Sequence, residues 1–329
     1  MIKLGIVGTN WISKSFLESA LASGYYDFTA IYSRKKETAV HFCQGYNPEL
    51  IETDFNAFAK ASEIDVVYIA SPNSVHFEQA KILIQSGKSI VVEKPAFSND
   101  KEFEEIIGLS QQHDVLIFEA ARHIHEKNFS ILKQKLDDIG EIVGGNFTYM
   151  KYSSRYNQVL LGEEPNIFSL KFSGGALVDL GVYLVYAAIK LFGIPQEYQY
   201  ICQKINTGVD GIGTIVFRYE TFDVTMQTGK ITDSFAKTEI YGSQGTLIAN
   251  SIECIDEIYI DKHGNRTQNL AYPKANINMI EEAEKFAELY LNRSKKAKEY
   301  ERLIELARHV NKIITELRKQ ENIIFDADK

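Results

Sequence analysis

From Ile2 to Phe118, short continuous apolar runs alternate with stretches in which apolar residues recur at helical spacing. Continuous apolar runs are typical of strands that are covered on both faces. The predicted strands are Ile2–Val7, Phe28–Tyr32, Val66–Ala70, Ile90–Val92 and Val115–Phe118. The predicted helices are Ile12–Ala22, Lys36–Cys43, Val75–Ser86 and Asp100–His113. This alternation predicts a doubly wound parallel sheet.

After Glu119 the pattern changes to longer strand signals joined by tight turns. The predicted strands here are Ile142–Tyr152, Tyr198–Ile205, Ile212–Tyr219, Phe222–Thr228, Lys237–Tyr241 and Thr246–Ala249. A long helical stretch, Ala176–Phe192, interrupts them, and two charged amphipathic helices follow at about Ile277–Leu291 and Lys295–Lys319. These signals predict an open sheet, mostly antiparallel, with helices on one face.

The predicted fold class is therefore α/β. Residues 1–119 are expected to form an N-terminal Rossmann dinucleotide-binding domain. Residues 120–329 are expected to form a C-terminal α+β domain with an open, mostly antiparallel sheet. A chain of 329 residues is too long for one ordinary core, which agrees with two domains.

Composition narrows the classes of partner. A net charge of −8 and a pI near 5.5 argue against nucleic acid, which binds basic faces. Cys43, Cys202 and Cys254 show no CxxC spacing and are expected to be reduced thiols of a cytoplasmic protein. No uninterrupted apolar run approaches the roughly 18 residues of a membrane span. The first apolar run has the features of a strand, not of a signal peptide. A small-molecule substrate is therefore expected, with no nucleic-acid or membrane partner.

The stretch Lys3–Ser13 (KLGIVGTNWIS) leads from an apolar strand through a glycine turn into a helix, as the start of a dinucleotide-binding βαβ unit requires. Gly8 takes the first glycine position of G-x-G-x-x-G, and Asn10 and Ser13 take the second and third. Asparagine tolerates left-handed dihedral angles, so Asn10 is expected to keep the turn. The expected cofactor contacts are Gly8, Thr9, Asn10, Trp11 and Ile12. An ordinary strand–helix turn is the alternative interpretation.

The second predicted strand ends in Tyr32-Ser33-Arg34-Lys35-Lys36. An acid at this position would bind the 2′-hydroxyl of the adenosine ribose, whereas a hydroxyl and a guanidinium suit a 2′-phosphate. Ser33 and Arg34 therefore favour NADP(H) as the cofactor, with NAD(H) as the second choice. The alternative is a solvated basic loop that precedes a helix.

Two more strand ends carry polar residues where ligands of parallel sheets bind. A ligand is therefore expected to contact Ser71, Pro72, Asn73 and His76 at the first of these strand ends, and Glu93 and Lys94 at the second. A lysine beside the nicotinamide can orient a substrate hydroxyl and assist its proton loss, and Glu93 would hold that lysine. The alternatives are a helix cap for the first loop and a salt bridge at the rim for Glu93 and Lys94.

The second half contains Ser173–Tyr183 (SGGALVDLGVY), in which Asp179 and Tyr183 lie four residues apart on one helix face. A tyrosine near a cationic lysine has its phenolate favoured and can exchange a proton. A structural hydrogen bond between buried residues is the alternative. His123 and His125 lie near acids but converge too little to predict a metal site, and no metal is expected.

These pieces, in this order, resemble the Gfo/Idh/MocA oxidoreductases, the family of glucose–fructose oxidoreductase and inositol dehydrogenase. The matching stretches are GIVGTNWIS, YSR, SPNSVH, EKP and GGALVDLGVY, which together span residues 5 to 183. The ending DLGVY is similar to the branch that contains dimeric dihydrodiol dehydrogenase, NADP-dependent xylose dehydrogenase and glucose–fructose oxidoreductase. That branch has tyrosine where inositol-dehydrogenase-like members have histidine.

The resemblance implies that Lys94 and Tyr183 are catalytic and that Asp179 binds substrate or orients its neighbours. It also implies that the cofactor contacts Ser71, Pro72, Asn73, His76, Glu93 and Lys94, with the nicotinamide near Glu93, Lys94 and the Asn73–His76 loop. It also implies a cis peptide before Pro95 and a homo-oligomer, dimer or tetramer, formed through the open sheet face. Two features depart from the family pattern: Asn10 replaces the second glycine, and EAARHIHEKNF lacks the family's proline. Arg122 and His123 in that segment are the candidate substrate contacts.

The predicted function is NADP(H)-dependent hydride transfer to or from a CH–OH or C=O group of a sugar, polyol or diol-like small molecule. Tyr183 would act as the proton shuttle, with Lys94 assisting. One alternative is a non-catalytic NAD(P)-binding regulator on the same fold, and another is reduction of an imine or an unsaturated bond. The presence of Lys94, Asp179 and Tyr183 together argues against a regulator, because a sensor needs no proton shuttle.

Overall fold

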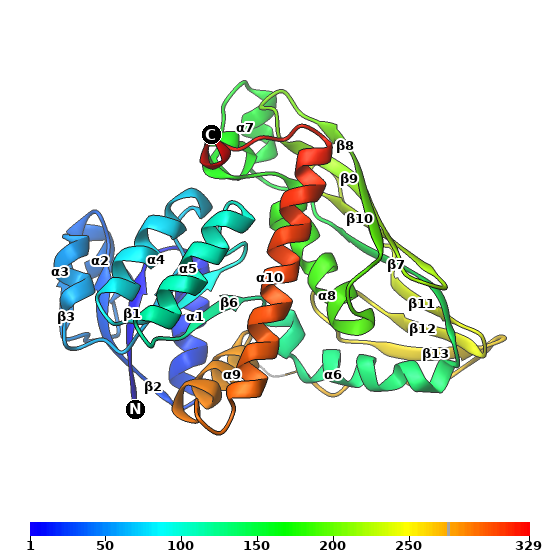
Figure 1. Cartoon of the computed structure of the whole chain (residues 1–329), viewed down its shortest axis with the longest axis horizontal. Coiled ribbons are helices and arrows are strands. Elements are labelled where there is room, and N and C mark those ends of the chain that lie inside the picture. The colour runs from blue at the N-terminus through cyan, green and yellow to red at the C-terminus, as the bar shows by residue number, and fades with distance from the viewer. Residues whose placement is uncertain (275–276) are drawn as a thin grey trace. The chain divides into compact units, whose positions relative to one another are not determined.

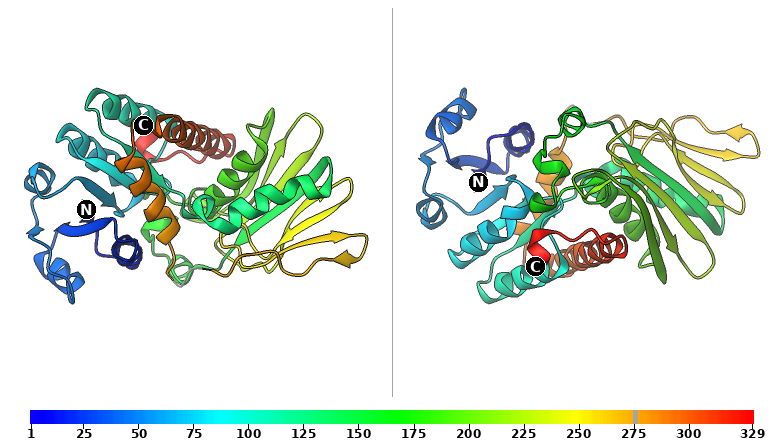
Figure 2. Two further views of the ribbon diagram at one scale, coloured as in Figure 1. Left: turned by 90° about the horizontal axis from the view of Figure 1, so that it is seen from below. Right: turned by 90° about the horizontal axis from the view of Figure 1, so that it is seen from above.

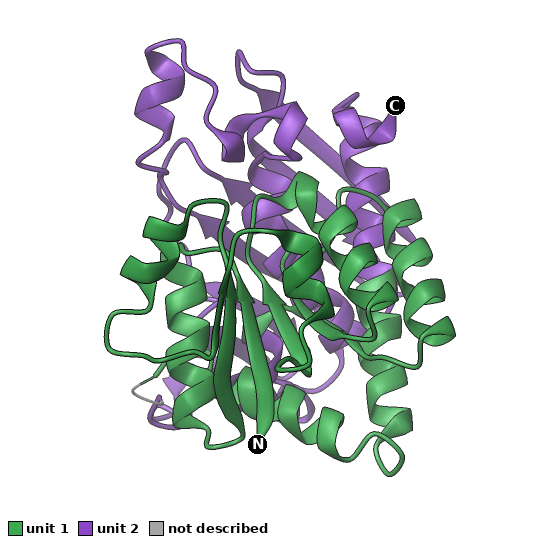
Figure 3. Ribbon diagram, turned by 90° about the vertical axis from the view of Figure 1, so that its left-hand side faces the viewer, with its two compact units in different colours: residues 1–122, 275–308 green, residues 123–274, 309–329 purple. Residues whose placement is uncertain are grey.

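The computed structural model describes residues 1–274 and 277–329, and the chain divides into two compact units (Figure 3). Unit 1 consists of Met1–Arg122 and Ala275–Arg308, and unit 2 of His123–Lys274 and His309–Lys329. The sequence places the boundary between residues 119 and 120 and assigns everything after it to the second domain. In the structure, a late segment of the chain belongs to unit 1 instead.

Unit 1 is built on a six-stranded sheet with the strand order β3-β2-β1-β4-β5-β6 (Figure 1). The strands are β1 (Ile2–Val7), β2 (Tyr26–Tyr32), β3 (Leu50–Glu52), β4 (Val66–Ile69), β5 (Ser89–Glu93) and β6 (Ile117–Ala120). The helices that follow them are α1 (Trp11–Ala22), α2 (Lys36–Phe42), α3 (Phe55–Lys60), α4 (His76–Gln85) and α5 (Asp100–Gln112). All five strand pairings are parallel, which confirms the predicted Rossmann-type α/β fold.

Two short elements of unit 1, β3 and α3, are absent from the sequence-based prediction. β3 pairs with β2 over only three residues, all of them partly exposed, so it leaves no continuous apolar run. α3 is six residues long and begins at an Asp54 cap, whose carboxylate accepts hydrogen bonds from the amides of Asn56 and Ala57. Elements this short are set by packing, because they carry too few residues to show a period.

The late segment of unit 1 contains α9 (Ile280–Leu291) and the first part of α10 (Ala297–Gln320). Phe286 stacks on Phe118 of β6 with ring centroids 4.8 Å apart, and the Tyr26 hydroxyl donates to the carbonyl of Ala283 at 3.0 Å. The Tyr300 hydroxyl accepts a hydrogen bond from the Ile117 amide at 3.1 Å. An amphipathic pattern predicts that these helices are buried on one side, but it does not say which sheet they cover.

Unit 2 is built on an eight-stranded sheet with the order β14-β13-β12-β11-β7-β10-β9-β8. The strands are β7 (Ile142–Met150), β8 (Glu197–Lys204), β9 (Asp210–Arg218), β10 (Asp223–Gly229), β11 (Thr238–Gly242), β12 (Gly245–Ala249), β13 (Ile258–Lys262) and β14 (Asn265–Arg266). Among the described strands of this sheet, β10 and β7 pair in parallel and the other neighbouring strands pair antiparallel. The predicted open, mostly antiparallel sheet is therefore confirmed.

Helices cover one face of this sheet. They include α6 (Lys127–Gln134) and α8 (Val182–Phe192), while α7 (Tyr156–Leu160) lies in the connection after β7 (Figures 1 and 2). The inward side chains Phe147, Ile215 and Met226 from three adjacent strands are fully buried beneath these helices. One stretch, Leu170–Phe192, has the length and hydropathy (1.6) of a membrane span, but 78% of its most apolar window is buried, as in the core helix of a folded domain.

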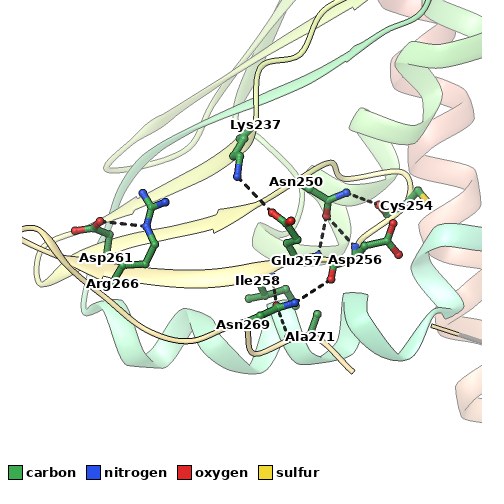
Figure 4. Close-up of polar contacts among 10 residues, drawn as sticks. All are labelled: Lys237, Asn250, Cys254, Asp256, Glu257, Ile258, Asp261, Arg266, Asn269 and Ala271. Atoms are coloured by element: carbon green, nitrogen blue, oxygen red, sulfur yellow. Dashed lines mark hydrogen bonds and ion pairs between the residues drawn. The ribbon is translucent and has the colours of Figure 1, made fainter. Parts of the chain in front are cut away.

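Asparagine side chains order the connection between β12 and β13 (Figure 4). The Asn250 amide oxygen accepts from the backbone amides of Asp256 and Glu257 at 2.8 and 3.0 Å, and its nitrogen donates to the carbonyl of Cys254. Beside this loop, Lys237 forms an exposed ion pair with Glu257 at 3.4 Å. The loop therefore has the internal hydrogen bonds of a turn without regular secondary structure.

The end of the described chain is held by Arg318, near the end of α10. Its guanidinium binds both oxygens of Asp328, at 2.5 and 2.7 Å, and lies 4.2 Å from the centre of the Phe325 ring. The Arg318 side chain is 1% exposed and that of Asp328 is 7% exposed. Burial tends to raise the pKa of Asp328, but the Arg318 hydrogen bonds and charge outweigh it and lower that pKa. This bidentate pair anchors the last residues to unit 2.

We predict that Asp328→Asn lowers the free energy of unfolding by about 3 kcal/mol near neutral pH, because the buried guanidinium loses its counter-charge. The pKa of Asp328 is lowered in the folded state. The difference between wild type and variant is therefore complete above roughly pH 4 and shrinks as the pH falls through the folded-state pKa. Urea unfolding at a series of pH values measures it.

Asp326→Asn is the matched control, because Asp326 is exposed and forms its ion pair with the exposed Lys329. This control should change the free energy of unfolding by less than about 1 kcal/mol. Equal effects of the two substitutions would contradict the anchoring role of Arg318.

Candidate active site

The glycine turn after β1 requires a residue without a side chain at its first position. Gly8 has φ +103°, and a Cβ there would lie 3.0 Å from the carbonyl oxygen of Ala70, at the end of β4. The turn leads into the N-terminus of α1, where unpaired backbone amides favour anions. This arrangement fits the pyrophosphate of a dinucleotide. A cavity of about 580 Å³ adjoins the turn and is lined by Thr9, Asn10, Trp11 and Lys14, together with residues of α2.

Asn10 keeps the turn, but not through left-handed dihedral angles. Its backbone is extended (φ −86°, ψ 178°), and its side chain caps α1 by accepting from the Ser13 amide at 2.9 Å. The Asn10 side-chain nitrogen also donates to the carbonyl oxygen of Ala70 at 2.7 Å. The substitution for the usual second glycine thus links the end of β1 to the end of β4. Two predicted neighbours differ in exposure: Trp11 is 77% exposed, while Ile12 packs against the core.

The β2–α2 connection carries the residues predicted for ribose recognition. The Ser33 and Thr38 hydroxyl oxygens are 2.6 Å apart, and Thr38 also donates to the Lys35 carbonyl. Arg34 and the two following lysines are exposed. A hydroxyl pair beside three exposed cationic side chains offers both the donors and the charge that a phosphate needs.

The loop after β4 is fixed by His76, which is fully buried. Its Nδ1 lies 3.1 Å from the carbonyl oxygen of Ala96, and its Nε2 lies 2.7 Å from that of Ser71. Burial lowers the pKa of His76, against the effect of these carbonyls. The imidazole therefore ties the Ser71–His76 loop, which includes the partly exposed Pro72 and Asn73, to the loop that follows Lys94.

Glu93 is the last residue of β5 and Lys94 follows it, and the Lys94–Pro95 peptide is cis, as the resemblance implies. The Tyr68 hydroxyl donates to Glu93 Oε1 at 2.5 Å, and Tyr68 itself stacks on Phe16 with ring centroids 3.9 Å apart. Burial raises the pKa of Glu93, and Lys94 and the Tyr68 hydrogen bond oppose this rise. Glu93 is therefore held in place from β4 as well as from its own strand.

In unit 2, the segment SGGALVDLGVY packs closely against three neighbours at its glycines. Gly174 passes against the backbone of Ile167, and Gly175, with φ +127°, passes against the Asp210 carboxylate. Gly181 lies against Leu177 and Thr228, where a Cβ would be 3.1 to 3.3 Å from their side chains. Small residues are needed at these positions because a side chain would displace the segment.

The predicted helix Ala176–Phe192 begins as a π-helical turn, η6 (Leu177–Gly181), and continues as α8. π-helical turns are rare in proteins overall, and those that occur often lie at functional sites. Asp179 lies in this turn with its side chain 32% exposed, and its carboxylate accepts from the ammonium of Lys230. The sequence-based prediction missed Lys230, which follows β10 and is 2% exposed. A lysine directly after a half-buried strand was the only signal in the sequence.

Tyr183 lies in the first turn of α8 and is partly exposed. Its ring contacts those of Tyr149 and His123, with centroids 5.5 and 4.9 Å apart. His123 Nε2 is 3.0 Å from the carbonyl oxygen of Tyr183, and His123 is only 1% exposed. His123 thus lies beneath the backbone of Tyr183, while Arg122, the last residue of the first segment of unit 1, is partly exposed.

The predicted residues therefore form two groups, each within its own unit. The unit 1 group lies along the carboxyl edge of the parallel sheet, on both sides of the β1–β4 junction where the chain order reverses. The unit 2 group lies on η6, α8 and the strands beneath them. Among residues 1–274 and 277–329, no three His, Cys, Asp or Glu side chains gather in a way that could hold a metal ion. The fold and the two groups define an NAD(P)-dependent oxidoreductase.

Comparison with known proteins agrees. Residues 2–120 match the family model of the NAD-binding Rossmann domain of the Gfo/Idh/MocA oxidoreductases, and residues 132–248 match the model of their C-terminal domain. The chain belongs to the Gfo/Idh/MocA family. It is 37% identical to scyllo-inositol 2-dehydrogenase (NADP(+)) IolU of Bacillus subtilis over 100% of both chains. It is also 37% identical to the uncharacterized oxidoreductase YgjR of Escherichia coli over 100% of this chain and 99% of that protein.

A solved structure also shares this fold. KijD10, a 3-ketoreductase from Actinomadura kijaniata in complex with NADP, superposes with a TM-score of 0.84 over 97% of both chains, at 19% identity. The IolU and KijD10 relatives are named as a dehydrogenase and a 3-ketoreductase, and these similarities do not support a non-catalytic regulator.

We predict that NADPH quenches the fluorescence of Trp11, the single tryptophan of the chain. Trp11 is exposed at the turn where the pyrophosphate is expected, so binding should transfer its excitation to the reduced nicotinamide. A titration followed at tryptophan emission and at NADPH emission measures the effect. Trp11→Phe is the control: it should abolish the energy transfer and keep the direct NADPH signal. Binding without any change at Trp11 would show that the cofactor lies elsewhere.

Proposed function

We propose that the protein is an NADP(H)-dependent dehydrogenase or reductase acting on polyols and related sugars, with a cyclic polyol such as scyllo-inositol as the substrate type. The main support is its 37% identity to a relative named scyllo-inositol 2-dehydrogenase (NADP(+)) over both complete chains. The placement of Asp179 and Tyr183 on one short helical segment, four residues apart, provides the polar groups that a hydroxyl substrate needs.

The names of two groups of relatives point to a shared substrate shape. The chain is 27% identical, over 66% of its length, to a trans-1,2-dihydrobenzene-1,2-diol dehydrogenase from Xenopus tropicalis. That diol and scyllo-inositol are both uncharged six-membered carbocycles in which neighbouring hydroxyls are trans. We infer that the substrate presents a secondary alcohol flanked by a trans hydroxyl on such a ring.

Each residue has a distinct role in this proposal. The nicotinamide cofactor, when bound, accepts or supplies the hydride. Tyr183 exchanges the proton of the reacting hydroxyl, and Lys94 favours the loss of that proton by its positive charge. Asp179 accepts a hydrogen bond from substrate. Arg122 remains a candidate substrate contact, whereas the burial of His123 beneath Tyr183 supports an indirect role for it.

The cofactor preference is assigned to the β2–α2 connection. Arg34, with the Ser33 hydroxyl beside it, would bind the 2′-phosphate of NADP(H), and no acidic side chain is present at the end of β2 to bind a free 2′-hydroxyl. The relative IolU is named with NADP(+). NAD(H) would bind more weakly because it lacks this charge-assisted contact.

The remaining expectations concern assembly and location. The face of the eight-stranded sheet opposite α6 and α8 carries no described helix (Figure 2), and Ile201 on β8 is 60% exposed. This supports a homodimer or homotetramer formed through that face, to be tested by light scattering of the purified protein. Three free cysteines support a reducing, cytoplasmic environment.

We predict that the wild-type protein reduces NADP+ in the presence of scyllo-inositol and that Tyr183→Phe lowers kcat/KM by about 100-fold or more, because a proton-transfer group is lost. Lys94→Ala should lower kcat to a similar extent and keep NADPH binding. The formation of NADPH, followed by its absorbance, measures turnover. Tyr272→Phe, at an exposed tyrosine of the same unit, is the control and should retain full activity.

Full turnover by Tyr183→Phe would reject its role as proton shuttle. A wild-type protein that binds NADPH but turns over neither polyols nor diols in either direction would reject the substrate class. Turnover of imines or unsaturated carbonyl compounds in that case would support the other reductive chemistry considered from the sequence.

We also predict that Arg34→Ala weakens NADPH binding by about 10- to 100-fold, because a charge-assisted hydrogen bond is lost, and leaves NADH binding unchanged. Fluorescence titrations with both cofactors measure the two affinities. Lys101→Ala, at an exposed position of α5 in the same unit, should change neither. Equal weakening of NADPH and NADH would mean that Arg34 does not discriminate the 2′-phosphate.

A further inference from the structure

Lys230 is a buried lysine whose position is fixed from two sides. It directly follows β10, and its backbone amide donates to the Gly211 carbonyl at 2.8 Å while its carbonyl accepts from the Ser153 amide at 2.9 Å. The residue is 2% exposed. Burying an ammonium group is costly unless a counter-charge compensates it. The described contacts of this ammonium are the Asp179 carboxylate and the ring of Phe168, whose centroid is 5.3 Å away.

Lys230 and Thr228 connect β10 to the π-helical turn. The two residues are separated by one position along the same extended segment, so their side chains project to the same side. The Thr228 hydroxyl donates to the carbonyl of Ala176 at 3.2 Å, and the methyl of Thr228 packs against Gly181. The Lys230 ammonium then contacts Asp179, which lies between Ala176 and Gly181 along the chain. The residues at the end of β10 and directly after it therefore contact the turn near its start, near its end and at the Asp179 carboxylate.

The exposure of the two partners separates this pair from a purely structural ion pair. In the Arg318–Asp328 pair both side chains are buried, at 1% and 7% exposure. In the Lys230–Asp179 pair the lysine is buried at 3% while the aspartate side chain is 32% exposed. The buried ammonium thus holds a carboxylate that is itself partly exposed and accessible to a ligand.

We propose that Lys230 is a positioning residue of the active site, which fixes Asp179 so that its carboxylate accepts the hydrogen bond of the substrate hydroxyl next to the reacting carbon. This inference rests on the proposed polyol dehydrogenase function. Lys230 acts through Asp179 and does not itself touch substrate, because its side chain is buried. An ionised carboxylate at a defined position can accept a hydrogen bond from one hydroxyl of an uncharged ring. The charge of that carboxylate is compensated by the Lys230 ammonium.

A double-mutant cycle tests this role. The activities of wild type, Lys230→Met, Asp179→Asn and the double variant are measured as kcat/KM for scyllo-inositol with NADP+. Lys230→Met should lower kcat/KM by about 100-fold, since a small displacement of a positioning group costs about that much. The double variant should be no less active than Asp179→Asn alone, because Lys230 has no effect once its carboxylate is removed. Losses that multiply would overturn the proposal.

Two further measurements exclude a general loss of structure. Lys237→Met removes the exposed ion pair with Glu257 in the same unit (Figure 4) and should keep wild-type kcat/KM. NADPH affinity, followed at Trp11, should stay within about twofold of wild type in all four proteins. If Lys230→Met does not fold, the double variant, in which both charges are absent, is compared with Asp179→Asn. Equal kcat/KM values would support the positioning role, and a further loss of kcat/KM in the double variant would contradict it.

The outcomes for the two proposals are distinguishable. Wild-type kcat/KM in a folded Lys230→Met variant would reject the positioning role and leave the polyol dehydrogenase function intact. Partial recovery of activity by Lys230→Arg would support the role, because the charge is restored at the same place. Absence of any polyol turnover in the wild type would reject the proposed function, and the role of Lys230 with it.

Discussion

The candidate site of unit 2 depends on the buried carboxylate of Asp210, at the start of β9. One of its oxygens accepts hydrogen bonds from the Leu177 amide at 2.6 Å and from the Tyr200 hydroxyl at 2.7 Å. Burial raises the pKa of Asp210, and these hydrogen bonds and the charge of Lys230 oppose the rise. Because the Leu177 amide opens the π-helical turn, the carboxylate acts as its cap and determines where the turn begins. The positions of the polar residues that follow along the segment depend on that contact.

This dependence explains why the segment combines glycines with chemical groups. Gly175 makes room for the Asp210 carboxylate, and Gly181 makes room for β10. Between these close approaches, Asp179 is the only ionisable residue, and its neighbours Val178 and Leu180 are buried. The same packing that brings the helix against the sheet therefore leaves the Asp179 side chain partly exposed while its carboxylate contacts the buried Lys230. In unit 1, Gly8 similarly allows a close approach to the carbonyl oxygen of Ala70, and the Asn10 side chain donates a hydrogen bond to the same oxygen.

Much of this arrangement could be predicted from the sequence, because the strands of the Rossmann domain are continuous apolar runs and its site residues follow directly after them. The sequence could not show that Asn10 caps α1 from an extended backbone, or that His76 is buried between two carbonyls, since both depend on loops from other strands. Lys230 was missed for the same reason: its importance comes from a partner 51 positions earlier in the chain. The late helix α9 has a clear apolar face, but amphipathicity does not identify the unit that the face covers.

The charged residues of the two predicted groups lie in different environments, each within its own unit. Within unit 1, the Glu93 carboxylate is adjacent to Lys94, and within unit 2 the Asp179 carboxylate meets Lys230. Each carboxylate thus has a cationic side chain of its own unit beside it, and the charges of Arg122 and Lys230 also act on Glu93 and Asp210. The exposed cations lie instead on the β2–α2 connection, at Arg34, Lys35 and Lys36. The proposed binding of the 2′-phosphate at this connection follows from these exposed cations, and the proposed recognition of a substrate hydroxyl follows from the Asp179 carboxylate that Lys230 holds.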